Sequence, residues 1–189
     1  AIRGLRIAVV GDFFLDKYLV VDPALAEVSL ETGKTAHQIV QIRCSPGAAG
    51  TVMNNLSALG VGRLEAVGVI GDNGEGYDLR RGLERARVGM RWLDASEERF
   101  TPTYTKPMRR EHGVEEEMER FDIKNREPLP PEYERRVLDA IRYLVTEERF
   151  HAVMIADQVQ ESNCGVITDR VREGLEGIAR EHPETLFFA

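Results

Sequence analysis

The sequence predicts an α/β fold in which a parallel β-sheet is flanked by helices and a small antiparallel β-sheet lies beside it. Three observations support this prediction. Short, nearly continuous apolar runs recur along the chain and end in Gly-Asp or Asp, as at Val10-Gly11-Asp12. Segments with helical periodicity separate these runs. Two further segments alternate apolar and polar residues, which is typical of antiparallel strands with one solvated face.

The apolar runs are the expected strands of the parallel sheet. Leu5 to Val10 and Leu64 to Ile70 are each followed by Gly-Asp, and Ala152 to Ala156 is followed by Asp. A strand covered by helices on both faces has this almost wholly apolar composition. Thr185 to Ala189 predicts a further strand, and Met90 to Leu93 predicts a short one.

Four segments between the strands place apolar residues three or four positions apart, which gives a helix one apolar stripe. The four sets are Ala49, Val52, Leu56 and Leu59; Leu79, Leu83 and Ala86; Tyr133, Val137, Ile141 and Leu144; and Ile167, Val171, Leu175 and Ile178. Gly60 ends the first set, and Pro130-Pro131 marks the start of the third. Strands that alternate with such helices predict parallel pairing, with the helices packed on the sheet.

Two segments interrupt this alternation. His37 to Arg43 alternates apolar and polar residues, and Thr103 to Lys106 and Glu117 to Phe121 flank a polar turn that we expect at His112-Gly113. We expect both segments to form one small sheet, the lid, beside the core. The predicted core is residues 1–17, 44–98 and 123–189, and the predicted lid is residues 18–43 and 99–122.

Composition excludes several classes of function. The 189 residues include 25 Lys plus Arg and 32 Asp plus Glu, and the net charge of −7 argues against broad binding to nucleic acid or anionic membranes. No apolar run is long enough for a membrane helix, and the four histidines lack metal-ligand spacing. The two cysteines, Cys44 and Cys164, predict free thiols in a reducing cytoplasm. We therefore expect a cytoplasmic protein without a bound metal and with no nucleic-acid or membrane partner.

Carboxylates follow the ends of two predicted core strands. Asp12 and Asp16 come after the first strand, and Asp157 directly follows the strand at Ala152 to Ala156. Ligands bind at this edge of open parallel sheets, and carboxylates there can accept hydrogen bonds from sugar hydroxyls or hold a cation. The alternative is that Asp12 caps a turn and Asp16 is merely solvated.

Small residues open the first predicted helix, from Ser45 to Thr51. They allow a ligand to approach the backbone, and the helix start offers free N–H groups; a tightly packed junction is the alternative. The segment is neither a P-loop nor a dinucleotide-binding motif. Lys106 and Arg120, on the two expected strands of the second lid segment, could reach an anionic group or be ordinary surface charges. No nucleophilic constellation is visible.

In order and spacing, these elements resemble the ribokinase-like family of carbohydrate kinases. The resemblance spans nearly the whole chain and rests on Val9 to Asp12 with Asp16, Pro46 to Gly60, Val67 to Asp72 with Gly76, Thr105-Lys106, Glu119 to Asp122 and Ile155 to Asp157. The Thr-Lys and Arg-Phe-Asp elements are most similar to the branch that phosphorylates heptose phosphates in cell-envelope sugar synthesis. The resemblance implies an incomplete, N-terminal part of a ribokinase-like fold, with a β-lid over the sugar that pairs with the lid of a second subunit.

The resemblance also implies substrate-binding residues. These are Asp12, Asp16, Gly47, Ala48, Thr51, Lys106, Arg120 and Asp157. Asp16 matches the carboxylate that binds sugar hydroxyls, and Gly47 and Ala48 match the Gly-Gly pair against which the sugar lies. Thr51 matches an Asn that contacts a sugar hydroxyl, so a shorter hydroxyl here replaces an amide that offers both a donor and an acceptor. The remaining four match positions near the sugar or its phosphate.

The implied reaction transfers the γ-phosphoryl group of ATP, with Mg²⁺, to a hydroxyl of a sugar or sugar phosphate. The family's catalytic base lies in a Gly-Ala-Gly-Asp motif beside the ATP pocket, and this sequence lacks that motif. We therefore expect no catalytic residue before residue 189, and no ATP or Mg²⁺ site among these residues, because phosphoryl transfer depends on groups around the γ-phosphate. The prediction is the sugar-binding portion of a carbohydrate kinase, inactive alone. A non-catalytic sugar-binding or regulatory module and a nucleoside kinase of the same fold remain alternatives.

Overall fold

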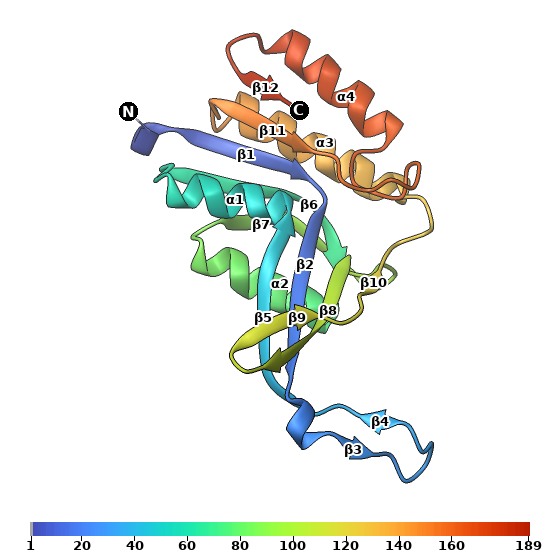
Figure 1. Cartoon of the computed structure of the whole chain (residues 1–189). Helices are drawn as coiled ribbons and strands as arrows, with labels where there is room; N and C mark the ends of the chain where they lie inside the picture. The colour runs from blue at the N-terminus through green and yellow to red at the C-terminus, as the bar shows by residue number, and fades with distance from the viewer. Residues whose placement is uncertain (1) are drawn as a thin grey trace.

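A computed structural model describes residues 2–189 and confirms the predicted α/β class (Figure 1). The first sheet has the strand order β12-β11-β1-β6-β7, and every neighbouring pair is parallel. Its strands are β1 (Arg6–Gly11), β6 (Arg63–Gly71), β7 (Gly89–Ser96), β11 (Ala152–Ala156) and β12 (Leu186–Phe188). Each predicted core strand is present, and β7 is longer than the short apolar run that predicted it.

Four α-helices cover the first sheet. They are α1 (Ala49–Ala58), α2 (Gly74–Arg85), α3 (Pro131–Thr146) and α4 (Asp169–Glu181). Alternate residues of β1 enter two different cores: Val9 packs with α1 and α2, whereas Val10 packs with α3 and α4. Because successive strand side chains point to opposite faces, this division shows that β1 is buried between two helical layers. That burial explains its almost wholly apolar sequence.

The second sheet contains strands from both predicted lid segments. Its order is β10-β8-β2-β5, with β9 paired to β8. The strands are β2 (Phe13–Val21), β5 (Ile39–Ala48), β8 (Thr103–Glu111), β9 (Val114–Glu117) and β10 (Phe121–Ile123). A short hairpin of β3 (Glu27–Val28) and β4 (Thr35–Ala36) projects from the far end of this sheet (Figure 1). Two 3₁₀ turns, Ile2–Gly4 and Pro23–Leu25, complete the secondary structure of the described residues.

The second sheet is mixed, whereas the sequence predicted antiparallel strands throughout. The difference lies in β2 and β8, which pair in parallel from Leu15 opposite Thr103 to Val21 opposite Arg109. The physical reason is that β2 follows β1 and β8 follows β7, so both leave the same edge of a parallel sheet and run in the same direction. The remaining pairs of this sheet are antiparallel, as expected.

The predicted turn between β8 and β9 is confirmed at His112-Gly113, where φ is 51° and 80°. Two successive residues with positive φ are typical of a tight hairpin turn. The division into a core and a lid stays a proposal, because β2 and β5 run without interruption across the predicted boundaries near residues 17 and 44.

Candidate functional site

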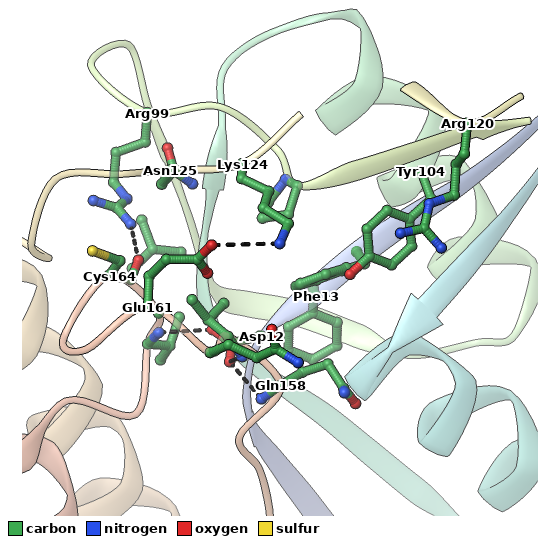
Figure 2. A pocket seen from close by; sticks show the side chains of 17 residues that line it. Asp12, Phe13, Arg99, Tyr104, Arg120, Lys124, Asn125, Gln158, Glu161 and Cys164 are labelled. Carbon is green, nitrogen blue, oxygen red and sulfur yellow. Dashed lines mark hydrogen bonds and ion pairs between the residues drawn. The ribbon is translucent and has the colours of Figure 1, made fainter. Parts of the chain in front are cut away.

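A cavity of about 150 Å³ lies where β1 and β11 end and the second sheet begins (Figure 2). It is lined by the β1–β2 junction, β6, the β7–β8 connection with the start of β8, the residues on either side of β10, and the loop between β11 and α4. Its lining residues are Asp12, Phe13, Phe14, Val69, Arg99, Pro102, Tyr104, Arg120, Lys124, Asn125, 158–161 and 164–166. This position, at the carboxyl ends of parallel strands, is where open α/β sheets bind ligands.

One face of the second sheet continues the cavity. Phe14, Asp16 and Tyr18 alternate along β2 and therefore share a face. Asp16 lies opposite Tyr104, and Tyr18 lies opposite Lys106. The Phe14 and Tyr104 rings both line the cavity and meet edge to face, with their centroids 5.3 Å apart. Asp16 and Lys106 therefore lie on the cavity side of the sheet, further along its strands.

Asp16 and Lys106 form an ion pair on this face. The Lys106 Nζ donates a hydrogen bond of 3.0 Å to Asp16 Oδ1, and the two side chains are 19% and 24% exposed for Lys106 and Asp16. The Lys106 ammonium also lies 5.0 Å from the centroid of the Tyr18 ring. Burial lowers the pKa of Lys106, but the hydrogen bond and negative charge of Asp16 outweigh it and raise that pKa overall. Two residues that the sequence analysis assigned to the site separately are thus brought together across two strands.

Gly47 provides the room for the Asp16 carboxylate. It lies on β5 opposite Phe14, and a Cβ at Gly47 would lie only 2.7 Å from Asp16 Oδ2. The neighbouring Ala48 precedes α1 with φ of 51°, an uncommon conformation for a residue with a side chain. Gly47 is therefore a close-approach glycine, as the sequence suggested, but what approaches it in this structure is a carboxylate of the same chain.

Arg120 forms one wall of the cavity. It lies between β9 and β10, just outside the strand on which it was predicted. Its guanidinium is 4.6 Å from the centroid of the Tyr104 ring and donates two hydrogen bonds, of 2.7 and 2.9 Å, to Asp122. Figure 2 shows this stacked pair on one side of the cavity and Lys124 with Glu161 on another.

Asp12 is buried at the bottom of the cavity. Its Oδ2 accepts hydrogen bonds from the backbone N–H groups of Gln158 (2.9 Å) and Val159 (3.3 Å), and its Oδ1 accepts one from Val166 N–H (2.7 Å). Burial raises the pKa of Asp12, while these hydrogen bonds oppose the rise. Both carboxylate oxygens therefore already have partners within the chain.

Two other predicted site residues lie outside the cavity lining. Asp157 is exposed and accepts a hydrogen bond of 3.0 Å from Arg172. Thr51 is exposed in the first turn of α1, and its hydroxyl donates to the Pro46 carbonyl at 3.4 Å. The structure brings Asp16, Gly47 and Lys106 together and places Asp12 and Arg120 in the cavity, but it adds neither Asp157 nor Thr51 to that group.

Sequence reasoning missed several lining residues. Tyr104 lies within the segment that supplied Lys106, but its ring gave no separate signal. Arg99 is half-buried, and burial lowers its pKa. Its guanidinium donates to the carbonyls of Glu127 and Pro128, both at 3.3 Å, and to that of Cys164. No local pattern shows that these distant segments meet around one arginine.

Within residues 2–189, no three His, Cys, Asp or Glu side chains are grouped to hold a metal ion. None of the described helices is long and apolar enough to cross a membrane.

The amino-acid sequence of this chain is similar to part of the bifunctional protein HldE of several bacteria. The chain is 27% identical over 180 residues to HldE of Syntrophotalea carbinolica, covering 95% of this chain and 34% of that protein. It is 28% identical to HldE of Geotalea uraniireducens, covering 92% and 33%. The chain thus spans about a third of the length of these relatives. No protein-family model matches the chain.

Solved structures of sugar kinases share the fold. A carbohydrate kinase from Agrobacterium tumefaciens matches 98% of this chain and 53% of its own chain, with a TM-score of 0.62 and 16% identity. Arabidopsis thaliana ribokinase, complexed with ribose and ATP, matches 97% and 52%, with a TM-score of 0.60 and 12% identity. These likenesses confirm a ribokinase-like fold that is present in part. Together with the HldE relatives, they confirm the resemblance on which the sequence prediction rested.

Proposed function

We propose that this chain is the sugar-binding portion of an ATP-dependent carbohydrate kinase. The parent reaction would transfer the γ-phosphoryl group of ATP, with Mg²⁺, to a hydroxyl of a sugar or sugar phosphate. The observation that carries the proposal is the Asp16–Lys106 pair, which lies beside a cavity at the carboxyl ends of the parallel strands. The plant ribokinase that shares the fold is complexed with ribose and ATP, which supports the same substrate class and phosphoryl donor.

In this proposal, Asp16 accepts hydrogen bonds from sugar hydroxyls, because an ionised carboxylate is a strong acceptor. Gly47 and Ala48 form the small surface against which the sugar ring lies, and the exposed Thr51 hydroxyl can turn from the Pro46 carbonyl toward the ligand. The chain's own work is therefore to bind and orient the acceptor. Groups that hold ATP, Mg²⁺ and the catalytic base are proposed to lie in sequence outside these residues.

Lys106 and Arg120 would give the site its preference for an anionic sugar. Each cation now has one carboxylate partner, Asp16 for Lys106 and Asp122 for Arg120. A phosphate on the substrate would offer both cations a second partner, and it would leave Asp16 free to accept from hydroxyls. A neutral sugar would give neither cation this gain. We therefore propose a sugar phosphate, such as a heptose phosphate, as the substrate.

We further propose a homodimer formed through the lid. β5 is an edge strand of the second sheet, and Ile39, Val40 and Ile42 on it are 47%, 48% and 58% exposed. Three neighbouring exposed apolar residues on a sheet edge favour pairing with a second copy.

The thiols of Cys44 and Cys164 are free, which supports the proposed cytoplasmic location.

A non-catalytic sugar-binding or regulatory module is the second candidate. One specific observation favours it: the segment from Gly47 to Thr51 differs from the family's Gly-Gly-x-x-Asn at two positions. Such a module would bind the sugar through the same residues without turnover. Kinase activity of the complete gene product, measured as ADP formation with a sugar phosphate, separates the two candidates.

Isothermal titration calorimetry tests the binding site itself. The ligands are a heptose phosphate, the same heptose without phosphate, and a nucleoside. We expect the heptose phosphate to bind best, and Lys106→Gln to weaken its binding more than that of the neutral heptose. Lys34→Gln is the matched control, because Lys34 is exposed on the projecting hairpin. Tightest binding by the nucleoside, or no binding of either sugar, would contradict the proposal.

A further inference from the structure

The Asp12 carboxylate accepts hydrogen bonds from both ends of the loop between β11 and α4, residues 157–168. Its donors Gln158 and Val159 open this loop, and its donor Val166 lies close to the loop's end. The backbone of Asp12 adds two hydrogen bonds, donating to the Ala156 carbonyl and accepting from Ala49 N–H, both at 3.0 Å. Asp12 therefore connects β1, β11, α1 and the loop at one point.

The same loop forms a large part of the cavity. Residues 158–161 and 164–166 all line it, opposite Tyr104 and Arg120 (Figure 2). The Arg99 guanidinium, which also lines the cavity, donates to the Cys164 carbonyl and to two carbonyls before α3. Lys124 adds an ion pair of 3.4 Å with Glu161. The position of this wall is therefore set by side chains that lie on other elements.

The Asp12 carboxylate is almost fully enclosed, although the residue lines the bottom of the cavity. Asp12 is 4% exposed, and a Cβ at Gly165 would lie 2.8 Å from its Oδ1 and 3.0 Å from its Oδ2. The loop backbone thus packs directly onto both oxygens. Oδ2 accepts two of the three backbone hydrogen bonds and Oδ1 accepts one, so most of the acceptor capacity of this carboxylate is already used within the chain.

We propose that Asp12 is a positioning residue, whose carboxylate fixes both ends of the 157–168 loop and so sets one wall of the sugar site without contacting the substrate. The sugar site itself rests on the proposed function above, whereas the order of the loop does not. Backbone N–H groups that donate to a carboxylate form charge-assisted hydrogen bonds, which are stronger than neutral ones. An asparagine has one acceptor oxygen and could replace only part of this arrangement.

Burying the ionised Asp12 carboxylate lowers the stability of the folded chain. Burial raises the pKa of Asp12 despite three hydrogen bonds, so the ionised carboxylate is less favourable in the folded chain than in water. A neutral replacement can therefore loosen the loop while leaving the overall stability nearly unchanged. That combination distinguishes a positioning residue from one that merely supports the fold.

Hydrogen–deuterium exchange of the full chain, followed by mass spectrometry of peptides spanning 157–168, tests the proposal. We expect Asp12→Asn to speed exchange of the Gln158, Val159 and Val166 amides at least tenfold, while thermal unfolding shifts by less than about 3 °C. The affinity for a heptose phosphate should fall at least fivefold in calorimetry. The control is Asp139→Asn, which removes an exposed carboxylate from α3 and should change none of these.

A second variant covers the case in which Asp12→Asn does not fold. Gly165→Ala adds a methyl group against the Asp12 oxygens and should speed the same amides without altering Asp12. Unchanged exchange of these amides in a folded variant would overturn the proposal. If the sugar affinity also fell in that variant, Asp12 would act by contacting the substrate. Faster exchange in a chain that binds no sugar would uphold the positioning of the loop and overturn the proposed function.

Discussion

Gly47→Ala is the substitution that most directly examines the geometry of the Asp16 carboxylate. The added Cβ would lie 2.7 Å from Asp16 Oδ2, 3.4 Å from its Cγ and 3.5 Å from Phe14 Cβ. Only the first contact is too close. To reach an ordinary contact of 3.4 Å, the Asp16 oxygen must retreat by about 0.7 Å.

The cost of this retreat falls on the site rather than on the fold. The atom that must move ends a side chain, so the free energy of unfolding should change by less than about 1 kcal/mol. The Asp16–Lys106 hydrogen bond, now 3.0 Å, would be displaced from its present geometry. If Asp16 then misses the sugar hydroxyl, one hydrogen bond to a charged group is lost, worth about 1.5–3 kcal/mol. That corresponds to a loss of about tenfold to a hundredfold in affinity.

Calorimetric titration with a heptose phosphate and urea denaturation measure the two effects separately. Gly74→Ala is the matched control, because a Cβ at Gly74 meets nothing within 4 Å. The decisive measurement is a double-mutant cycle: Gly47→Ala should cost almost no affinity when Asp16→Asn is already present, because both changes act on one carboxylate. An equal loss of affinity in both backgrounds would refute the reasoning.

Three further predictions concern the carboxylates and the lid. Asp16→Asn alone should weaken sugar binding by about 1–3 kcal/mol in calorimetry, and unchanged affinity would remove Asp16 from the site. Light scattering at concentrations well above micromolar should give the mass of a dimer, and Ile42→Glu should dissociate it; a monomeric wild type would count against the lid interface. Burial raises the pKa of Asp12, with Asp157 adding to the rise and Arg99 as the nearby cation. Since the folded pKa lies above the unfolded one, the stability that Asp12 contributes is fully present below about pH 4 and is lost as the pH rises through the folded pKa. Urea denaturation should therefore show wild type losing stability relative to Asp12→Asn as the pH increases above about 4, and a gain would contradict this sign.

Local sequence determined most of the secondary structure of this protein. The run from Leu5 to Val10 became β1 because a strand buried on both faces is apolar at nearly every position. Val171, Leu175 and Ile178 predicted α4 because they return every three or four positions to one face; the helix begins at Asp169, so Ile167 lies just before it. The turn at His112-Gly113 followed from residues that tolerate positive φ. The candidate residues Asp16, Lys106 and Arg120 were singled out by their places in the predicted strands, and the resemblance supplied their roles.

Only the tertiary structure decided which of these residues act together. Asp16 and Lys106, 90 residues apart in the sequence, meet because β2 and β8 pair in parallel, and no local pattern specifies which distant strand is the partner. The sequence left open whether Asp12 binds a ligand or caps a turn, and in the structure the β11–α4 loop returns over it and donates to both oxygens. The sequence by itself thus determined the elements and the types of side chain at the sheet edge. The roles of those side chains were decided by long-range pairing and by the path of one loop, neither of which leaves a local pattern in the chain.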